Sequence, residues 1–127
     1  MKIVHTGVWT RDDRAADPWP GLPFEVPPGS PGVTVELAVA DPAAVLDLGC
    51  AGPAGWRGWS GGARTRFTIT PGAATPGYLP GELEPGTWQV VLGLHRVPAR
   101  GVDYTVTVTG GGTVEPPPPG PPVPPRP

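Results

Sequence analysis

The sequence predicts an all-β domain: an antiparallel β-sandwich, jelly-roll-like, with about seven short strands. Apolar and polar residues alternate with a period of two, the pattern of a strand with one buried face. Glycine and proline, 20 and 22 of the 127 residues, separate these segments and exclude a helical bundle. A hydrophobic content of 38%, five tryptophans and a net charge of −2 argue against a disordered chain.

The alternation identifies the strands along the chain. It is clearest in residues 33–39, 88–95 and 104–109. Shorter segments of the same kind are residues 4–10, 24–26, 45–48 and 66–70. Dipeptides such as Asp41-Pro42, Pro71-Gly72 and Pro85-Gly86 mark turns between them. Residues 51–65 and 73–83 lack the alternation, so we expect long loops there, and we expect no helix.

The composition divides the chain into two parts. We expect residues 1–109 to form one β-sandwich domain and residues 110–127 to form a disordered tail or linker rich in glycine and proline. The last twelve residues contain nine prolines, which is typical of an extended polyproline II segment and not of a packed core.

Charge, cysteine and histidine content exclude several functions. Nine Lys and Arg residues against eleven Asp and Glu residues leave no basic face, so we expect no nucleic-acid partner. The one cysteine, Cys50, has no intrachain disulfide partner and follows an apolar strand, so we expect it to be buried. The two histidines, His5 and His95, have no cluster of ligands around them, so we expect no metal site and no cofactor.

The sequence also lacks the features of an enzyme and of a membrane protein. Ser60 is not in a nucleophile elbow, and we expect no catalytic residue in this chain. No apolar run approaches the roughly 20 residues of a membrane span, and the first residues lack the apolar region of a signal peptide. We therefore expect a cytoplasmic protein without a membrane partner; no feature indicates an oligomeric state.

Residues 55–64 and the nearby turn at residues 75–78 carry most of the candidate binding groups. The candidate interaction surface consists of Trp56, Arg57, Trp59, Ser60, Arg64 and Tyr78. Tryptophan and arginine together are typical of surfaces that bind sugars, carboxylates or a partner domain. Alternatively, the two tryptophans plug the end of the sandwich while the arginines cap loop carbonyls, and the tyrosine ring packs inside.

Several blocks of the sequence resemble a known family. They are residues 22–27, 45–49, 55–64, 74–81 and 83–94, which include Gly-Trp-Arg-Gly-Trp-Ser-Gly-Gly and Leu-Glu-Pro-Gly-Thr-Trp. In this order, over about residues 3 to 109, they resemble the N-terminal β domain of bacterial CehA/McbA-type metallohydrolases. In that family a metal-dependent catalytic domain of the PHP (polymerase and histidinol phosphatase) type follows the β domain.

The resemblance implies a role without catalysis for this chain. The family's active site opens with a His-x-His pair, and the present sequence has none. The chain is then a non-catalytic accessory domain, either a stand-alone copy or one part of a split hydrolase, that packs against or covers a PHP catalytic domain. The alternative is a stand-alone module that binds carbohydrate or peptide.

Overall fold

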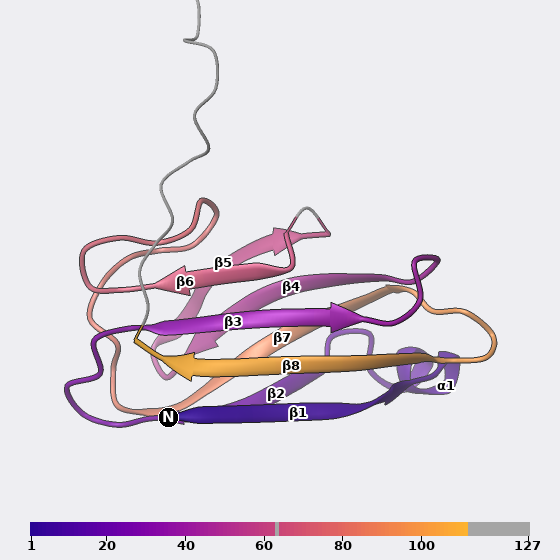
Figure 1. Cartoon of the computed structure of the whole chain (residues 1–127), viewed down its shortest axis with the longest axis horizontal. Helices are drawn as coiled ribbons and strands as arrows, with labels where there is room; N and C mark the ends of the chain where they lie inside the picture. Colours follow the sequence, from indigo (N-terminus) through magenta and orange to yellow (C-terminus); the bar gives the residue numbers. More distant parts are fainter. Residues whose placement is uncertain (63, 112–127) are drawn as a thin grey trace, which may run out of the picture.

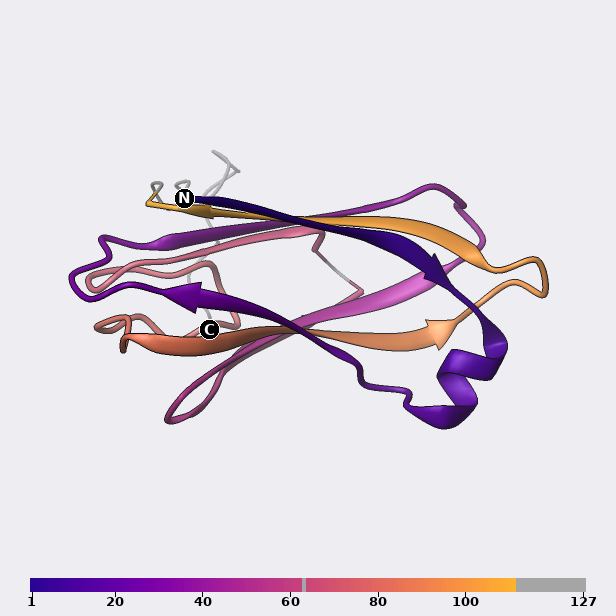
Figure 2. The ribbon, with the colours of Figure 1, turned by 90° about the horizontal axis from the view of Figure 1, so that it is seen from below.

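The protein folds as two four-stranded antiparallel sheets that pack face to face (Figures 1 and 2). The computed structural model describes residues 1–62 and 64–111. It confirms the all-β sandwich. The tail expected to be disordered lies outside the described residues from residue 112 on.

Within the described residues, eight strands form the two sheets. The first sheet has the order β1 (Lys2–Trp9), β8 (Val102–Gly110), β3 (Val33–Val39) and β6 (Arg66–Ile69). The second has the order β2 (Gly21–Val26), β7 (Gly86–Arg96), β4 (Val45–Gly52) and β5 (Gly55–Gly61). Each of the seven segments predicted from alternation overlaps a different strand.

The strand β5 corrects the prediction of a loop over residues 51–65. It pairs with β4 along the edge of the second sheet. Two irregularities interrupt its pairing with β4, so its inward and outward residues do not alternate with a period of two. This is why the sequence pattern did not reveal it.

A short helix, α1 (Arg11–Ala16), corrects the expectation that the chain contains no helix. Thr10 caps its first turn, because the Thr10 side chain accepts a hydrogen bond from the Asp13 amide while the Asp13 carboxylate accepts one from the Thr10 amide. The helix lies at one end of the sandwich, where the chain passes from β1 in one sheet to β2 in the other (Figure 2).

The core lies between the sheets. Its largest fully buried side chains include Trp88, Phe67 and Leu48. Cys50 is buried as predicted, and burial raises the pKa of its thiol to about 12. His95 is exposed, as its place in the alternation of β7 predicts.

A matched pair of leucine variants tests this core. Leu48→Ala removes a side chain with no exposed surface, so we expect a loss of about 2–5 kcal/mol in the free energy of unfolding. Leu79→Ala makes the same change at a side chain that is 60% exposed, and we expect a loss below about 0.5 kcal/mol. Urea unfolding measures both, and equal losses would contradict the assigned core.

Candidate functional site

The first irregularity of β5 places one tryptophan outside and one arginine inside. Ala51 of β4 lies opposite Trp56, and the next residue, Cys50, lies opposite Gly58. Arg57 is therefore an extra residue without a cross-strand partner, as in a β-bulge. Its side chain is buried, whereas that of Trp56 is 60% exposed.

The second irregularity lies three residues further along β5, at Ser60, and again adds one residue without a cross-strand partner. Gly49 lies opposite Trp59, and Leu48 lies opposite Gly61, so Ser60 is the extra residue. Leu48 is fully buried, so its neighbour Gly49 faces the outside of the sheet together with Trp59. Residues three positions apart in a regular strand point to opposite faces. The first bulge, at Arg57, brings Trp56 and Trp59 to the same face.

A third tryptophan joins them from the segment before β2. Pro18 and Pro20 accept hydrogen bonds from the amides of Leu94 and Leu92, so this segment continues β2 alongside β7. Trp19 between them points outward and is 55% exposed. Trp19 is not part of the interaction surface predicted from the sequence, because Pro-Trp-Pro carries no strand pattern. The one signal for Trp19 is its position two residues before the outward-facing Gly21.

We call Trp19, Trp56 and Trp59 the tryptophan face. The ring of Trp59 contacts both of the others, with ring centroids 5.3 Å from Trp19 and 6.2 Å from Trp56. The ring planes meet at 60° and 89°, so the contacts are edge-to-face. The three side chains line a hollow of about 460 Å³. Such a volume lies within the range of small-molecule sites.

Two glycines allow the rings to lie close to the sheet. A Cβ atom at Gly49 would lie 2.3 Å from Cε3 of Trp59, and a Cβ atom at Gly93 would lie 2.7 Å from Cζ3 of Trp19. Any larger residue would push the rings away. The Asp47 carboxylate flanks the same glycine as Trp19, because the Cβ atom at Gly93 would also lie 3.1 Å from its Oδ2 atom. One acidic group therefore borders the tryptophan face.

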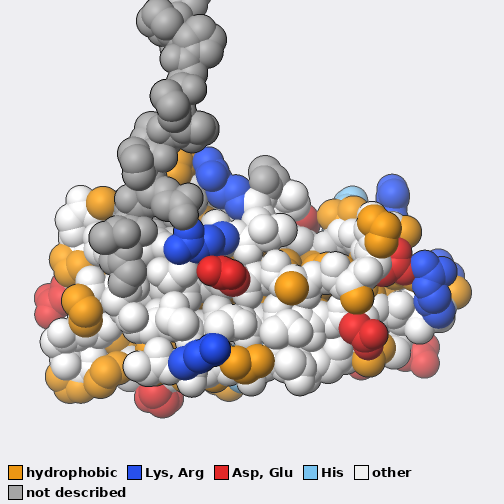
Figure 3. All heavy atoms as spheres, viewed as in Figure 1, with side chains coloured by type: hydrophobic (Ala, Val, Ile, Leu, Met, Phe, Trp, Pro, Cys, Tyr) orange, Lys and Arg blue, Asp and Glu red, His pale blue; other side chains and the backbone are white. Residues whose placement is uncertain are grey.

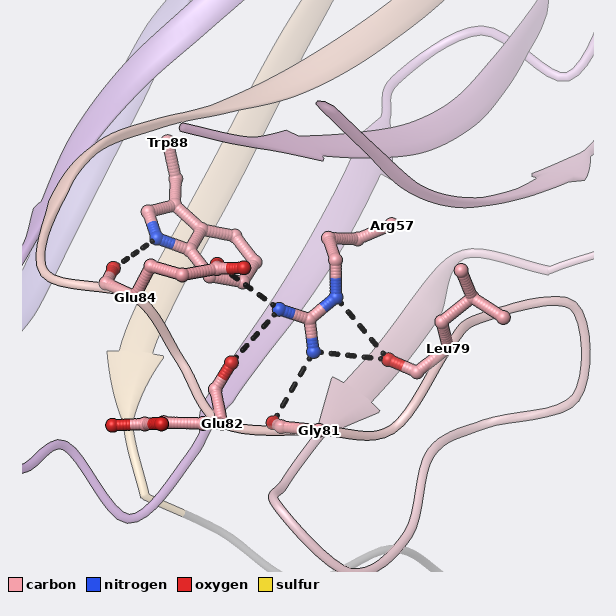
Figure 4. A network of polar contacts seen from close by, with 6 residues as sticks. All are labelled: Arg57, Leu79, Gly81, Glu82, Glu84 and Trp88. Atoms are coloured by element: carbon pink, nitrogen blue, oxygen red, sulfur yellow. Dashed lines mark hydrogen bonds and ion pairs between the residues drawn. The ribbon is translucent and has the colours of Figure 1, made fainter. Parts of the chain in front are cut away.

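Arg57 does not belong to this face, since its guanidinium group holds a loop from inside (Figure 4). Nε and Nη2 both donate to the Leu79 carbonyl oxygen, at 3.3 and 3.1 Å. Nη2 also donates to the Gly81 carbonyl at 3.2 Å, and Nη1 donates to the Glu82 carbonyl at 3.1 Å. The loop between β6 and β7 is thus attached to β5 through three backbone carbonyls.

Glu84 and Trp88 complete the surroundings of this guanidinium group. Nη1 of Arg57 lies 3.3 Å from Oε2 of Glu84, and the Arg57 Cζ atom lies 4.8 Å from the ring centroid of Trp88. The indole nitrogen of Trp88 in turn donates to the Glu84 carbonyl at 2.8 Å. Of the two alternatives raised by the sequence, Arg57 follows the one in which arginine caps loop carbonyls.

Ser60 and Tyr78 also point away from the tryptophan face. The Tyr78 hydroxyl lies 2.8 Å from the Ser60 hydroxyl and 3.2 Å from the Leu48 carbonyl oxygen. The Tyr78 ring stacks on Phe67 with centroids 4.2 Å apart. Burial raises the pKa of Tyr78 to about 12, so the phenol is neutral at physiological pH and serves packing.

The predicted interaction surface therefore divides into two groups. Trp56, Trp59 and Arg64 reach the surface, whereas Arg57, Ser60 and Tyr78 are held between the sheets and the loop.

Among the described residues there is no group of three His, Cys, Asp or Glu side chains that can hold a metal ion. No helix in this part of the chain is long and apolar enough to cross a membrane. Comparisons with models of protein families, with curated proteins and with solved structures found no match to the chain.

Two arginines of the same block give a matched test of the inward and outward positions. Arg57→Met leaves the three loop carbonyls without their donors, so we expect a loss of about 3 kcal/mol or more in the free energy of unfolding. Arg64→Met changes an exposed side chain, and we expect a loss below about 0.5 kcal/mol. Urea unfolding distinguishes them; a small effect at Arg57 would refute its structural role.

Proposed function

We propose that this chain is a non-catalytic β-sandwich domain that binds through the tryptophan face, and that its partner is a catalytic domain of the PHP hydrolase type. The observation that carries the proposal is the gathering of Trp19, Trp56 and Trp59 on one face. A monomeric protein rarely exposes contiguous apolar surface without a binding role. Tryptophan is also enriched among the residues that dominate binding energy at protein interfaces.

The residues that carry the resemblance to CehA/McbA-type proteins also build this face, which supports the choice of partner. The block at residues 55–64 supplies Trp56 and Trp59. The blocks at residues 45–49 and 83–94 supply Gly49 and Gly93, on which the rings lie. A docking role for this face explains why glycine and tryptophan occur at positions where the sandwich alone requires neither.

A binding experiment with a matched control tests the proposal. The chain is titrated with the separately expressed PHP domain of a CehA/McbA-like protein, and calorimetry measures the dissociation constant. We expect Trp56→Ala to weaken binding about tenfold or more, because it removes an exposed anchor of the face. Leu79→Ala, equally exposed at 60% but outside the hollow, leaves binding unchanged. No binding by the unchanged chain, or equal affinities of the two variants, would refute the proposal.

A second candidate function is carbohydrate binding, and the hollow with its acidic border favours it. Indole rings present apolar faces to the C–H groups of a sugar, and a carboxylate accepts hydrogen bonds from its hydroxyls. Asp47 lies beside Trp19 and supplies this acceptor. A free peptide offers no such regular array of hydroxyl donors, so we take carbohydrate as the more specific alternative.

Neutralising the Asp47 carboxylate distinguishes carbohydrate binding from docking of a protein partner. Calorimetric titration with a panel of neutral oligosaccharides is expected to show binding that Asp47→Asn weakens about tenfold, through loss of a charged hydrogen-bond acceptor. Asp103→Asn, an exposed position on the other sheet, serves as the matched control. Carbohydrate binding is excluded if no member of the panel binds, and Asp47 is excluded if both variants bind equally.

A further inference from the structure

The four outer edges of the sandwich belong to β1 and β6 in the first sheet and to β2 and β5 in the second. A free edge exposes backbone N–H and C=O groups that can pair with another strand, so proteins normally cover or block it. In this structure three of the four edges are covered or blocked. The fourth, at β1, is neither covered nor blocked by any of the described residues.

The loop between β6 and β7 covers two edges. Along β5, the amide of Trp59 donates to the Gly77 carbonyl and the amide of Leu79 donates to the Arg57 carbonyl, at 3.2 and 2.7 Å. Along β6, the amide of Thr75 donates to the Thr68 carbonyl at 2.9 Å. Outward backbone groups of Arg57, Trp59 and Thr68 are thereby used within the chain.

The edge of β2 is blocked by a proline and a histidine. Pro23 lies in the middle of β2 and has no N–H group to offer. Its carbonyl oxygen lies 2.9 Å from Nε2 of His5, which reaches across from β1. A further strand therefore finds neither a donor nor a free acceptor at this position.

The edge of β1 has no comparable protection. The amide of Gly110 donates to the Met1 carbonyl, so in the alternating antiparallel pattern the odd-numbered residues of β1 bond to β8. The backbone groups of Lys2, Val4, Thr6 and Val8 point away from the sheet, with no hydrogen-bond partner among the described residues. β1 contains no proline, and its pairing with β8 has no bulge.

Two of the four outward-facing side chains along this edge are apolar. Val4 and Val8 are 50% and 51% exposed, and both point to the outer face of the first sheet. Most of that face carries neither charged nor hydrophobic side chains, with separate charged groups upon it (Figure 3). Two exposed valines on an unprotected edge are what a partner strand would cover.

We propose that β1 pairs antiparallel with β1 of a second copy of this chain, so that the two first sheets join into one continuous sheet. The register that places the exposed valines opposite one another has Thr6 opposite Thr6 of the second copy and uses the free backbone groups of Val4, Thr6 and Val8. Val4 then lies opposite Val8 of the second copy, and Val8 opposite its Val4. Each of these pairs can exchange two hydrogen bonds, and the valines cover one another.

Self-complementarity favours a second copy over an unrelated strand. A two-fold axis through the Thr6 pair brings identical surfaces together, as an isologous interface requires. The tryptophan face lies on the other sheet, so the pairing is independent of the proposed function.

Sedimentation velocity over roughly a hundredfold range of concentration tests the pairing. A single strand pair is a small interface, so we expect reversible growth from 13.1 kDa toward twice that mass. Thr6→Pro removes an outward amide without touching the bonds to β8, and Val4→Lys places a charge at the contact; both are expected to remain monomeric. Ala38→Lys, on the same face but two strands from the edge, is expected to dimerise like the unchanged chain.

Amide exchange measured by NMR locates the contact. The amides of Val4, Thr6 and Val8 are expected to become protected as the concentration rises, whereas the amide of Glu25 at the edge of β2 is not. A chain that stays monomeric at every concentration overturns the proposal. So does a dimer that survives both Thr6→Pro and Val4→Lys, or one without protection in β1. Circular dichroism verifies folding, and if Thr6→Pro unfolds, Val4→Lys decides.

Discussion

The buried guanidinium group of Arg57 is the constraint on which the rest of this end of the sandwich depends. A charge inside a protein is tolerated when its donors are satisfied, because removal from water without compensation is costly. Here three loop carbonyls, the Glu84 carboxylate and the face of Trp88 surround it. The loop between β6 and β7 therefore has one position available to it. Fixed there, it bonds to the edges of β5 and β6 and carries Tyr78 onto Phe67.

The same irregularity that turns Arg57 inward turns the tryptophans outward. A regular strand would send Trp56 and Trp59 to opposite faces, one into the core and one into water. The bulge at Arg57 instead aligns both rings on the outer face, and the second bulge leaves Ser60 as a further inward residue. The buried position of Arg57 and the outward position of the two tryptophans, on which the proposed binding depends, thus originate from one local departure from strand geometry. Because these residues point to opposite sides of the sheet, we expect substitutions of the inward Arg57 to change stability and substitutions of the outward tryptophans to change the proposed binding.

The fold was largely accessible from the sequence, and the site was only partly so. Alternation locates the strands that have one face in the core, such as residues 33–39 and 88–95. It fails at β5, because bulges remove the period, and at α1, whose stability comes from the Thr10 cap and not from an apolar stripe. Composition identified the block with Trp56 and Trp59, but which residues face outward depends on register. Trp19 depends on a contact between segments far apart in the chain, which no local pattern reports.

The most direct test of this arrangement is a map of cross-strand proton contacts between β4 and β5 by NMR. We predict contacts between the backbone protons of Ala51 and Trp56, of Cys50 and Gly58, and of Gly49 and Trp59, with Arg57 and Ser60 lacking a cross-strand partner. A continuous ladder in which Arg57 and Ser60 each pair with a residue of β4 would contradict it, since the two tryptophans would then lie on opposite faces of the sheet.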